Sequence, residues 1–475
     1  MTVDGMISPG GPRHGRRGRR VAIALGLAAV FVTSAVVGAA VGPVDFRALV
    51  AQVAGASTPA PSPVATPAPS LSPSPSPASS PSPSPSAVAS PTLAPTPSAS
   101  PTASPSPSPS PTVAPAVARR LQGALEKARK KFGLPGVSAT VILPDGATWT
   151  GVAGYANTAT KRRVTPGTPF AAASVTKTFT AALILRLADE GRLRLDDRLS
   201  RWLPDYPNAR RITLRMLLQH TSGLPDFFQS GALEAAMLKN RRRVFSPAEV
   251  LRYAKGALFA PGKGWYYSNT NFVLLGLVAE KAGGKPWATL VRRELLDPLG
   301  LEDTYVQVSE APPGRAPAHG YRYFSSATTG RPRDQGDGTL VVPFTSVVSA
   351  AWSAGEIAAT TPDLARWARA LYAGDVLSPA SRKAMMDVST TKKLGARLAY
   401  GLGMSRLKLG NRFVGYGHSG SIGGFRAAIR HFPKEGTIVA VMFNRDAYKG
   451  DDVVGLLMEA LYPKPKPSPS PAASP

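Results

Sequence analysis

A long proline-rich segment at residues 57–115 decides which part of this chain can form a packed fold. Of its 59 residues 20 are proline, most of the others are Ser, Ala or Thr, and none is charged or aromatic. Such a composition cannot bury an apolar core, and it favours extended polyproline II structure. Residues 463–475 are similar in composition. We therefore expect a disordered linker at 57–115 and a disordered tail at 463–475, with one folded domain at 116–462.

The chain begins with a basic segment, residues 1–20, which is followed by 22 uncharged residues at 21–42. An apolar run of that length fits a transmembrane helix, and the arginines before it predict that residues 1–20 stay in the cytoplasm. A cleaved signal peptide is the alternative, because Gly38 and Ala40 offer small residues to a signal peptidase. The run is long for a signal peptide. The expectation is therefore a single-pass, membrane-anchored extracytoplasmic protein, with secretion after cleavage as the alternative.

The chain carries a net charge of +27 and has no cysteine. Most of the charge falls on residues 116–462, where it can attract anionic wall polymers, lipid head groups or carboxylate substrates. A general bias of the sequence toward arginine is the simpler explanation. We expect no nucleic-acid partner, because the domain is expected outside the cell and shows no nucleic-acid-binding motif. Without cysteine, the chain can form neither disulfides nor a cysteine lipid anchor.

The apolar pattern of residues 116–462 predicts an α/β (α+β) fold. An amphipathic helix at 117–133 is followed by a hairpin with its turn at 144–146, and a second hairpin turns at 433–436. The helical patterns between the hairpins lie at 175–190, 213–219, 247–256, 270–282, 287–296 and 362–373. The simplest arrangement is an antiparallel sheet built from both chain ends and flanked by helices, plus a mostly helical lobe. A cleft is expected between sheet and lobe.

Ser174 and Lys177 stand three residues apart at the start of the apolar stretch "SVTKTFTAALILRL". Residues i and i+3 share one face of a helix, so the hydroxyl and the amine can meet at its first turn. A serine hydroxyl is a poor nucleophile until a base takes its proton, and a lysine can do so only when it is neutral. Burial and the partial positive charge of the helix N-terminus both lower a lysine pKa. The pattern therefore predicts a nucleophile and its base.

The Ser-x-x-Lys pattern alone is weak, since it recurs at Ser389 and Ser405 in polar stretches. Only Ser174 begins a long apolar helix. Candidate partners lie downstream in "YSN", where Tyr267 and Asn269 precede a second apolar helix. A phenolate can accept or relay a proton, and an asparagine amide can hydrogen-bond a substrate amide. These residue types are the partners that a nucleophilic serine needs.

A third motif, "HSG", consists of His418, Ser419 and Gly420 at the head of a glycine-rich strand. Its lack of bulk allows a substrate to lie against the backbone. The overlapping "GHSGS" almost matches the nucleophile elbow of α/β-hydrolases, but the last glycine is missing. No Asp or Glu separates Ser419 from the later His431, so the order Ser, acid, His of that fold is also absent. We reject Ser419 as a nucleophile on these grounds.

In this order, "SVTK", "YSN" and "HSG" resemble the motifs of the serine beta-lactamase and D-alanyl-D-alanine carboxypeptidase family. The resemblance is greatest to the branch with class C beta-lactamases, DD-peptidases and related esterases, and it extends over about residues 130–462. It implies a sheet domain packed on a helical domain, which the patterning also predicts. It further implies a serine hydrolase that works through an acyl-enzyme and needs no cofactor.

The resemblance assigns roles by position. It implies that Ser174 is the acylated nucleophile, Lys177 its proton partner and Tyr267 the general base that later returns a proton or activates water. The backbone N–H groups of Ser174 and Ser421 would form the oxyanion hole. The residues that it implies for substrate binding are Asn269, His418, Ser419 and Gly420.

His418 departs from the pattern of the beta-lactamases in this branch, which carry lysine at that position, and matches the histidine of the DD-peptidases. A neutral imidazole attracts a substrate carboxylate less than a fixed ammonium does. We therefore do not expect efficient beta-lactamase activity.

The expected function is that of a D-alanyl-D-alanine carboxypeptidase-like, penicillin-binding enzyme on peptidoglycan stem peptides, which a domain tethered by the linker can reach. The alternatives are an esterase or amidase of the same family acting on small substrates, and a catalytically silent cell-wall-binding module. We expect a monomer without a metal, since the chain has five histidines, no cysteine and no His-Glu-x-x-His motif. His220, in "QHTSG", is expected to shape a loop beside the cleft.

Overall fold

The structure is a computed structural model that describes residues 111–322, 332–394 and 398–464. The predicted basic segment and membrane anchor lie outside these residues, as do nearly all of the predicted linker and tail. Those expectations stay predictions. Within the described ranges, no helix combines the length and the apolar character that crossing a membrane requires.

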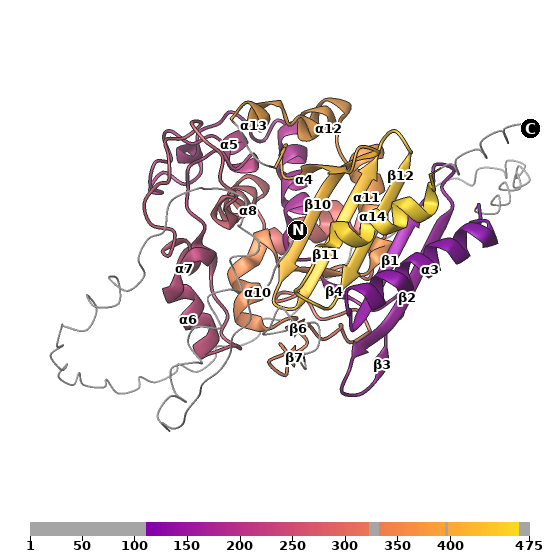
Figure 1. Ribbon diagram of the computed structural model, residues 1–475. Coiled ribbons are helices and arrows are strands. Elements are labelled where there is room, and N and C mark those ends of the chain that lie inside the picture. Colours follow the sequence, from indigo (N-terminus) through magenta and orange to yellow (C-terminus); the bar gives the residue numbers. More distant parts are fainter. Residues whose placement is uncertain (1–110, 323–331, 395–397, 465–475) are drawn as a thin grey trace, which may run out of the picture. The chain divides into compact units, whose positions relative to one another are not determined.

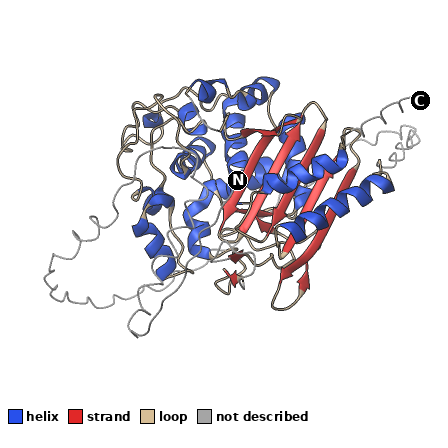
Figure 2. Cartoon of the chain, in the orientation of Figure 1, coloured by secondary structure: helices blue, strands red, loops and turns tan. Residues whose placement is uncertain are grey.

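A seven-stranded antiparallel sheet forms the main layer of the fold (Figures 1 and 2). Strands from the two ends of the described chain pair at its centre, with Val137 opposite Phe443 and Ile142 opposite Ile438. The strands from edge to edge are β3 (Arg162–Arg163), β2 (Thr148–Asn157), β1 (Gly136–Ile142), β12 (Thr437–Phe443), β11 (Phe425–Phe432), β10 (Phe413–Ile422) and β9 (Ser405–Leu409).

Helices cover both faces of this sheet (Figure 1). Helices α3 (Pro115–Lys131) and α14 (Gly450–Leu461) pack on one face, and α11 (Thr361–Ala373) packs on the other. Helix α3 buries Leu121 and Leu125, whose spacing of four residues places them on one side of the helix. The amphipathic pattern of α3 therefore explains how it docks.

The central strand β12 is buried along its whole length. Val439 and Val441 belong to the apolar cluster that contains α3 and α14, whereas Ile438 and Ala440 belong to the cluster that contains α11 and the helical lobe. Successive side chains of a strand point to opposite faces, so a continuous apolar run suits a strand with helices on both sides. Each large apolar side chain buried in this way contributes about 1.5–3 kcal/mol.

A mostly helical lobe lies beside the sheet (Figure 2). Its helices are α4 (Thr176–Asp189), α5 (Leu214–Leu218), α6 (Gly231–Lys239), α7 (Pro247–Leu251), α8 (Asn269–Gly283), α9 (Trp287–Val291), α10 (Thr345–Ala351), α12 (Pro379–Met386) and α13 (Ser389–Lys393). Two small sheets complete the described structure: β4 (Phe170–Ala171) with β8 (Ile357–Ala359) and β5 (Tyr305–Val306), and β6 (Tyr321–Arg322) with β7 (Arg333–Asp334).

The predicted fold class is confirmed: an antiparallel sheet from both chain ends, flanking helices and a helical lobe. One predicted helix end was wrong, and one predicted helix changes its type along its length. Helix α7 ends at Leu251 rather than at residue 256, because the following chain turns toward Gly256, which has a left-handed φ of 82°. The segment predicted as one helix at 287–296 is α9 followed by a π-helical turn, Arg292–Leu296.

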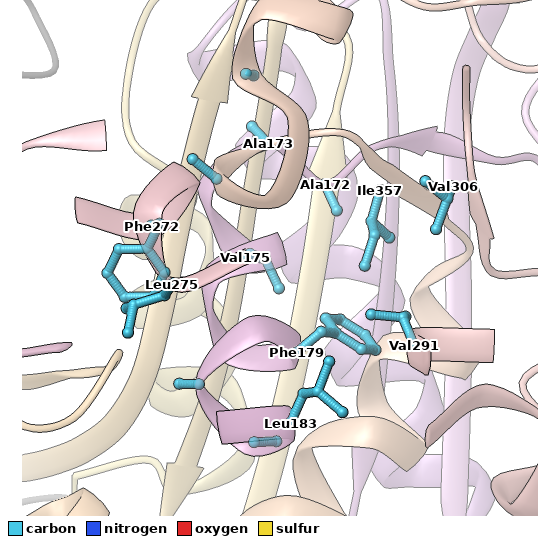
Figure 3. Packing of buried hydrophobic residues seen from close by; sticks show 14 of the residues in the cluster. Ala172, Ala173, Val175, Phe179, Leu183, Phe272, Leu275, Val291, Val306 and Ile357 are labelled. Carbon is cyan, nitrogen blue, oxygen red and sulfur yellow. The ribbon is translucent and has the colours of Figure 1, made fainter. Parts of the chain in front are cut away.

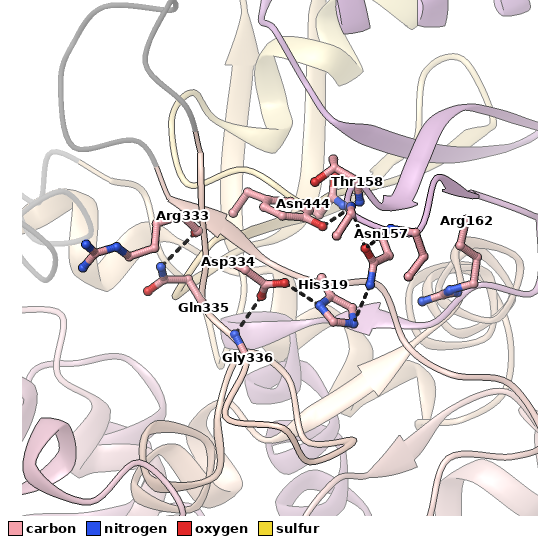
Figure 4. Close-up of polar contacts among 12 residues, drawn as sticks. Asn157, Thr158, Arg162, His319, Arg333, Asp334, Gln335, Gly336 and Asn444 are labelled. Carbon is pink, nitrogen blue, oxygen red and sulfur yellow. Dashed lines mark hydrogen bonds and ion pairs between the residues drawn. The ribbon is translucent and has the colours of Figure 1, made fainter.

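A histidine outside the predicted motifs ties the β6–β7 hairpin to strand β2 (Figure 4). His319 Nδ1 lies 2.6 Å from Asp334 Oδ2, and His319 Nε2 lies 3.1 Å from the side-chain nitrogen of Asn157. Both ring nitrogens are therefore engaged by neighbouring side chains. The His319–Asp334 pair thus links two segments of the fold. Neither ring nitrogen is available to activate a nucleophile.

Candidate active site

Ser174 lies where the chain passes from strand β4 into helix α4. It belongs to a single 3-10 turn, η1 (Ala173–Val175), that runs directly into the helix. The Ala172 N–H donates to the Ile357 carbonyl at 2.9 Å and so ties this turn to strand β8. Ala173 has a left-handed φ of 50°. Such a conformation costs about 1–3 kcal/mol in a residue other than glycine, so the surroundings hold the backbone beside Ser174 under strain.

Helix α4 is anchored in the core on nearly every side. The Phe179 ring stacks on Trp367 of α11 with ring centroids 4.0 Å apart. Figure 3 shows Phe179 and Leu183 beside Val291 of the neighbouring helix α9. The helix cannot shift without opening this packing, so its first turn is a rigid support for the residues above it.

Lys177 is completely buried, and its amine reaches three oxygen atoms. Lys177 Nζ lies 3.1 Å from the hydroxyl of Ser174, 2.7 Å from Oδ1 of Asn269 and 2.8 Å from the carbonyl oxygen of Ala354. The structure thus brings together Ser174, Lys177 and Asn269, although Lys177 and Asn269 lie 92 residues apart in sequence. These contacts fix the amine beside the serine hydroxyl.

The environment of Lys177 favours its neutral form. Burial lowers the lysine pKa, and the negative charge of Asp226 opposes this effect only in part. A neutral amine has a lone pair, so it can accept the proton of the Ser174 hydroxyl instead of donating to it. This environment is therefore consistent with the predicted role of Lys177 as the base, which stays a prediction.

Tyr267 also contacts the candidate nucleophile. Its side chain hydrogen-bonds Ser174, and its ring centroid lies 5.1 Å from Lys177 Nζ. Burial raises the pKa of Tyr267, and the nearby Asp226 carboxylate raises it further. The sequence argument expected a phenolate, but this environment favours the neutral phenol. A phenol can still relay a proton between Ser174 and a leaving group.

His220 lies in the turn that follows helix α5, and its ring packs against that of Tyr267. Its ring is buried, with its centroid 4.3 Å from that of Tyr267. His220 Nδ1 accepts from the Ser268 backbone N–H at 3.2 Å and lies 3.0 Å from the amide nitrogen of Asn271. Burial and the nearby Lys177 lower the pKa of His220 and keep the ring neutral. The histidine thus holds the "YSN" segment in place.

Asn269 is bound on both sides of its amide. Its Oδ1 accepts from Lys177, and its Nδ2 donates to Asp226 Oδ2 at 2.8 Å. An amide nitrogen has two N–H groups, so the bond to Asp226 uses only one of them. The predicted contact of Asn269 with a substrate amide stays a prediction. Asp226 was missed by the sequence argument, although it stands in the "HTSGLPD" stretch that also contains His220.

Strand β10 approaches Ser174 closely at Gly420. A Cβ atom on Gly420 would lie 2.2 Å from the carbonyl oxygen of Ala172 and 3.1 Å from Cβ of Ala173. Only glycine leaves room for this approach. Here the missing side chain makes room for the turn that carries Ser174. The predicted role of Gly420, to let a substrate lie against the strand backbone, stays a prediction.

The imidazole of His418 is engaged at both nitrogens. Nε2 lies 2.8 Å from the hydroxyl of Tyr400, and Nδ1 lies 2.6 Å from the carbonyl oxygen of Ser419. The carbonyl can only accept, so Nδ1 carries the proton and Nε2 accepts from Tyr400. Burial, with a smaller contribution from the nearby Lys177, lowers the pKa of His418 to about 3. His418 is therefore neutral, and both of its ring nitrogens are hydrogen-bonded within the protein.

The hydroxyls of Ser419 and Ser421 are directed to other partners. Ser419 Oγ donates to Asp451 of α14 at 2.6 Å and accepts from Arg430 at 2.7 Å. Ser421 Oγ accepts from Arg426. The hydroxyl of Ser419, which was predicted to bind substrate, is thus part of the packing between β10 and α14. For Ser421 the prediction concerned its backbone N–H as an oxyanion-hole donor, and it stays a prediction.

The other two Ser-x-x-Lys occurrences do not resemble this site. Ser389 begins the short helix α13, and its hydroxyl donates to Asp387. Ser405 lies in strand β9, where its hydroxyl donates to the Gly417 carbonyl and accepts from Arg430. In the described part of the chain, Ser174 is the serine of the three that meets its own lysine.

Comparisons with known proteins show what this chain is similar to. A family model described as Beta-lactamase matches residues 121–461. A penicillin-binding protein of Bacillus subtilis (strain 168) is 33% identical over 254 residues, which make up 53% of this chain and 55% of the relative. A D-aminopeptidase of Gluconobacter oxydans (strain 621H) is 28% identical over 337 residues, 68% of this chain and 58% of the relative. The chain thus matches little more than half the length of these two relatives.

A solved structure has a fold similar to that of this chain. The crystal structure of a D-stereospecific amidohydrolase from Streptomyces sp. has a TM-score of 0.61 and 30% sequence identity. The similarity covers 73% of this chain and 98% of that one.

Proposed function

Because the chain belongs to the beta-lactamase family of serine hydrolases, we propose that it cleaves amide bonds of D-amino acids, as a D-alanyl-D-alanine carboxypeptidase-like enzyme on peptidoglycan stem peptides. The observation that carries this proposal is the 3.1 Å contact between Lys177 Nζ and Ser174 Oγ, at a buried lysine whose pKa is lowered. A contact of that kind activates a serine for acyl transfer.

The proposed acylation begins with Ser174. A bond forms between Ser174 Oγ and the substrate carbonyl carbon while the neutral amine of Lys177 takes the hydroxyl proton. The backbone N–H groups of Ser174 and Ser421 are the proposed donors to the oxyanion, which such donors stabilise strongly. When the carbon–nitrogen bond breaks, the leaving amine takes a proton that Tyr267 relays from the Lys177 ammonium. The leaving product departs, and Ser174 is left as an ester.

The proposed deacylation reverses the proton path. Water attacks the ester carbonyl carbon as its proton passes through the Tyr267 hydroxyl to Lys177. The bond between the carbonyl carbon and Ser174 Oγ then breaks, and the serine recovers its proton. The raised pKa of Tyr267 fits a neutral phenol that passes protons on, with Lys177 as the base in both steps.

The shape of strand β10 supports an extended peptide as substrate. Strand β9 pairs with residues 413–417 of β10, and its register ends there, before His418 and Gly420. An extended peptide can add to an unpaired strand edge through backbone hydrogen bonds. We propose the D-configuration for the substrate because two similar proteins are named a D-aminopeptidase and a D-stereospecific amidohydrolase.

An amidase or esterase of small substrates is the second candidate, and His418 is the observation that favours it. The imidazole is neutral and hydrogen-bonded at both nitrogens, so it offers no fixed positive charge to a terminal carboxylate. A peptide carboxylate would need another cation, whereas an ester or a primary amide would not. The same feature argues against efficient beta-lactamase activity.

We also propose that the hydrolase acts outside the cytoplasm, held by residues 21–42 and spaced from the membrane by the linker at 57–115. The support is the uncharged run behind a basic segment and the proline-rich composition. A spacer of this kind would let the site reach wall peptides tens of ångströms from the membrane.

The substrate proposal is tested by product release. The full-length chain is incubated with a tripeptide ending in D-Ala-D-Ala, with the same peptide ending in L-Ala-L-Ala, and with a short-chain aryl ester. We expect release of D-alanine and little release of L-alanine, and no turnover by Ser174→Ala. Turnover of the ester alone would replace the peptidase by the esterase. No turnover of any of them, with no penicillin labelling, would favour the binding module.

A further inference from the structure

Asp226 is a buried carboxylate behind the candidate catalytic residues. It caps the short 3-10 turn η3 (Phe227–Gln229), where its Oδ1 accepts from the Phe228 backbone N–H at 3.1 Å. Its other oxygen accepts from Asn269 Nδ2 at 2.8 Å. Both carboxylate oxygens of Asp226 thus accept a hydrogen bond, and the donor of one of these bonds is Asn269, which also contacts Lys177.

The bond from Asp226 fixes the direction of the Asn269 amide. An asparagine amide has a donor nitrogen on one side and an acceptor oxygen on the other. With the nitrogen turned to Asp226, the oxygen must face Lys177, from which it lies 2.7 Å away. A turned amide would instead place N–H groups against the Lys177 amine and an oxygen against a carboxylate, so both contacts would become unfavourable.

We propose that Asp226 is a positioning residue for acylation: it orients the Asn269 amide toward Lys177, and its negative charge sets how readily Lys177 gives up its proton. This inference rests on the proposed function, in which Lys177 is the base for Ser174. It adds a fourth member, Asp226, to the chain of contacts that begins at Ser174.

Among the groups around Lys177, Asp226 is the carboxylate whose negative charge raises the pKa of the lysine. The other titratable side chains that face Lys177 are Tyr267, His220 and His418, and burial favours the neutral form of each. Burial raises the pKa of Asp226, while Lys177 and the hydrogen bonds from Phe228 and Asn269 oppose that change. The two buried groups therefore influence each other directly.

Asp226 is also among the residues that line a surface cleft of about 810 Å³. The charged residues of this cleft are Arg243, Glu249, Arg252 and Lys255, and Tyr253 also lines it. Arg243 pairs with Glu249 at 2.6 Å. Glu249 therefore offers a matched control, a carboxylate on the same cleft that has no bond to Asn269.

The test compares pH profiles of kcat/KM for an aryl ester, measured on the full-length chain. Asp226→Asn keeps the size of the side chain and removes its charge. Without that charge the ammonium of Lys177 is less stabilised, so we expect the acid limb to move to lower pH by roughly one unit. Asp226→Glu keeps the charge and should keep the limb within a few tenths of the wild-type position.

Asp226→Ala removes both the charge and the hold on Asn269. We expect kcat to fall by roughly tenfold or more at the optimum, with a smaller change in KM, because the misdirected amide disturbs the base more than substrate binding. Glu249→Gln should leave the profile unchanged, since glutamine also serves at this position of a capping box. Thermal melting of each variant confirms that it is folded.

The outcomes separate this inference from the proposed function. If wild type turns over no substrate and is not acylated, the proposed function fails first. If wild type is active, and folded Asp226→Asn has the wild-type acid limb, the electrostatic role is overturned. If Asp226→Ala also keeps the wild-type kcat, the positioning role is overturned as well. Equal shifts in Asp226→Asn and Glu249→Gln would show a general effect of cleft charge and contradict a specific role of Asp226.

Discussion

Lys177 Nζ lies 3.1 Å from Ser174 Oγ, and no part of the Lys177 side chain reaches solvent. An exposed lysine keeps its proton at neutral pH and cannot act as a base. Burial of helix α4 removes water from the amine and so disfavours its charged form. The packing that makes α4 a stable core helix therefore also lowers the pKa of Lys177, as the proposed mechanism requires.

Replacing the lysine should slow acylation severely without unfolding the protein. Lys177→Met removes the amine and places an apolar chain of similar length in a fully buried position. We expect acylation by a fluorescent penicillin to slow by roughly 10²–10⁴-fold, the usual contribution of a general base. The melting temperature should be retained or raised, because the variant buries no amine. Labelling of this variant at the wild-type rate would refute the proton role of Lys177.

The pH dependence of the reaction should reveal the same lysine. Burial lowers the pKa of Lys177 to about 7. Because the neutral amine is the active form, kcat/KM for an aryl ester should rise with pH through that region and level off above it. A pH titration between 5 and 10 measures this limb. A limb that begins near 10, the ordinary range of lysine, would show that the amine is not held in its neutral form.

Gly420→Ala should damage the site through backbone displacement. The added Cβ would lie 2.2 Å from the Ala172 carbonyl oxygen, a distance that forces β10 away from the turn that carries Ser174. We expect a loss of kcat/KM of tenfold or more, and a loss of roughly 1–3 kcal/mol in the free energy of unfolding.

The matched control for this variant is Gly123→Ala in the middle of helix α3, where a Cβ would meet no atom within 4 Å. Alanine is the better helix former, so this change should stabilise the protein by roughly 0.5–1 kcal/mol and leave activity unchanged. Equal activity of the two variants would contradict the close approach at Gly420.

Glu356 should make stability depend on pH. Its side chain is buried, Oε1 accepts from the Val308 N–H at 3.0 Å, and within the described residues Oε2 has no hydrogen-bond partner. Burial raises its pKa from 4.5 to about 8. The folded state thus holds the proton more tightly than the unfolded state does. The resulting stability is complete below about pH 4.5 and is lost as the pH rises through 8.

Glu356→Gln removes this titration. Wild type and variant should be equally stable near pH 4, and the variant should be more stable by roughly 2–5 kcal/mol at pH 9. Chemical denaturation across this pH range measures the difference. A constant difference between the two proteins would contradict the burial of an ionisable Glu356.

Much of the fold could be predicted because its strands and helices follow simple apolar periods. The hairpin of β11 and β12 and the apolar run after Ser174 are examples of such local patterns. Helix α14 was missed although Val453, Val454 and Leu457 lie on one of its faces, so the signal was present. The end of α7 could not be predicted in this way, because it depends on the packing of the following loop, which contains glycine and proline and has no apolar periodicity.

The members of the candidate site could be named from sequence, but their exact contacts could not. Spacing placed Lys177 beside Ser174, since both belong to the same helical turn. Asp226 carries no periodic signal, because its role arises from a contact with Asn269, 43 residues away. The direction of the Ser419 hydroxyl depends likewise on Asp451, which lies 32 residues away in sequence, in the first turn of helix α14.

The central claim is that Ser174 is the acylated nucleophile, and peptide mapping by mass spectrometry tests it most directly. Trypsin cleavage after Arg163 and Lys177 yields the peptide of residues 164–177, in which Ser174 is the only serine. After incubation of the full-length chain with a penicillin and rapid quenching in acid, we predict the added mass on that peptide and on that serine. An adduct on another residue, or equal labelling of Ser174→Ala, would contradict the account.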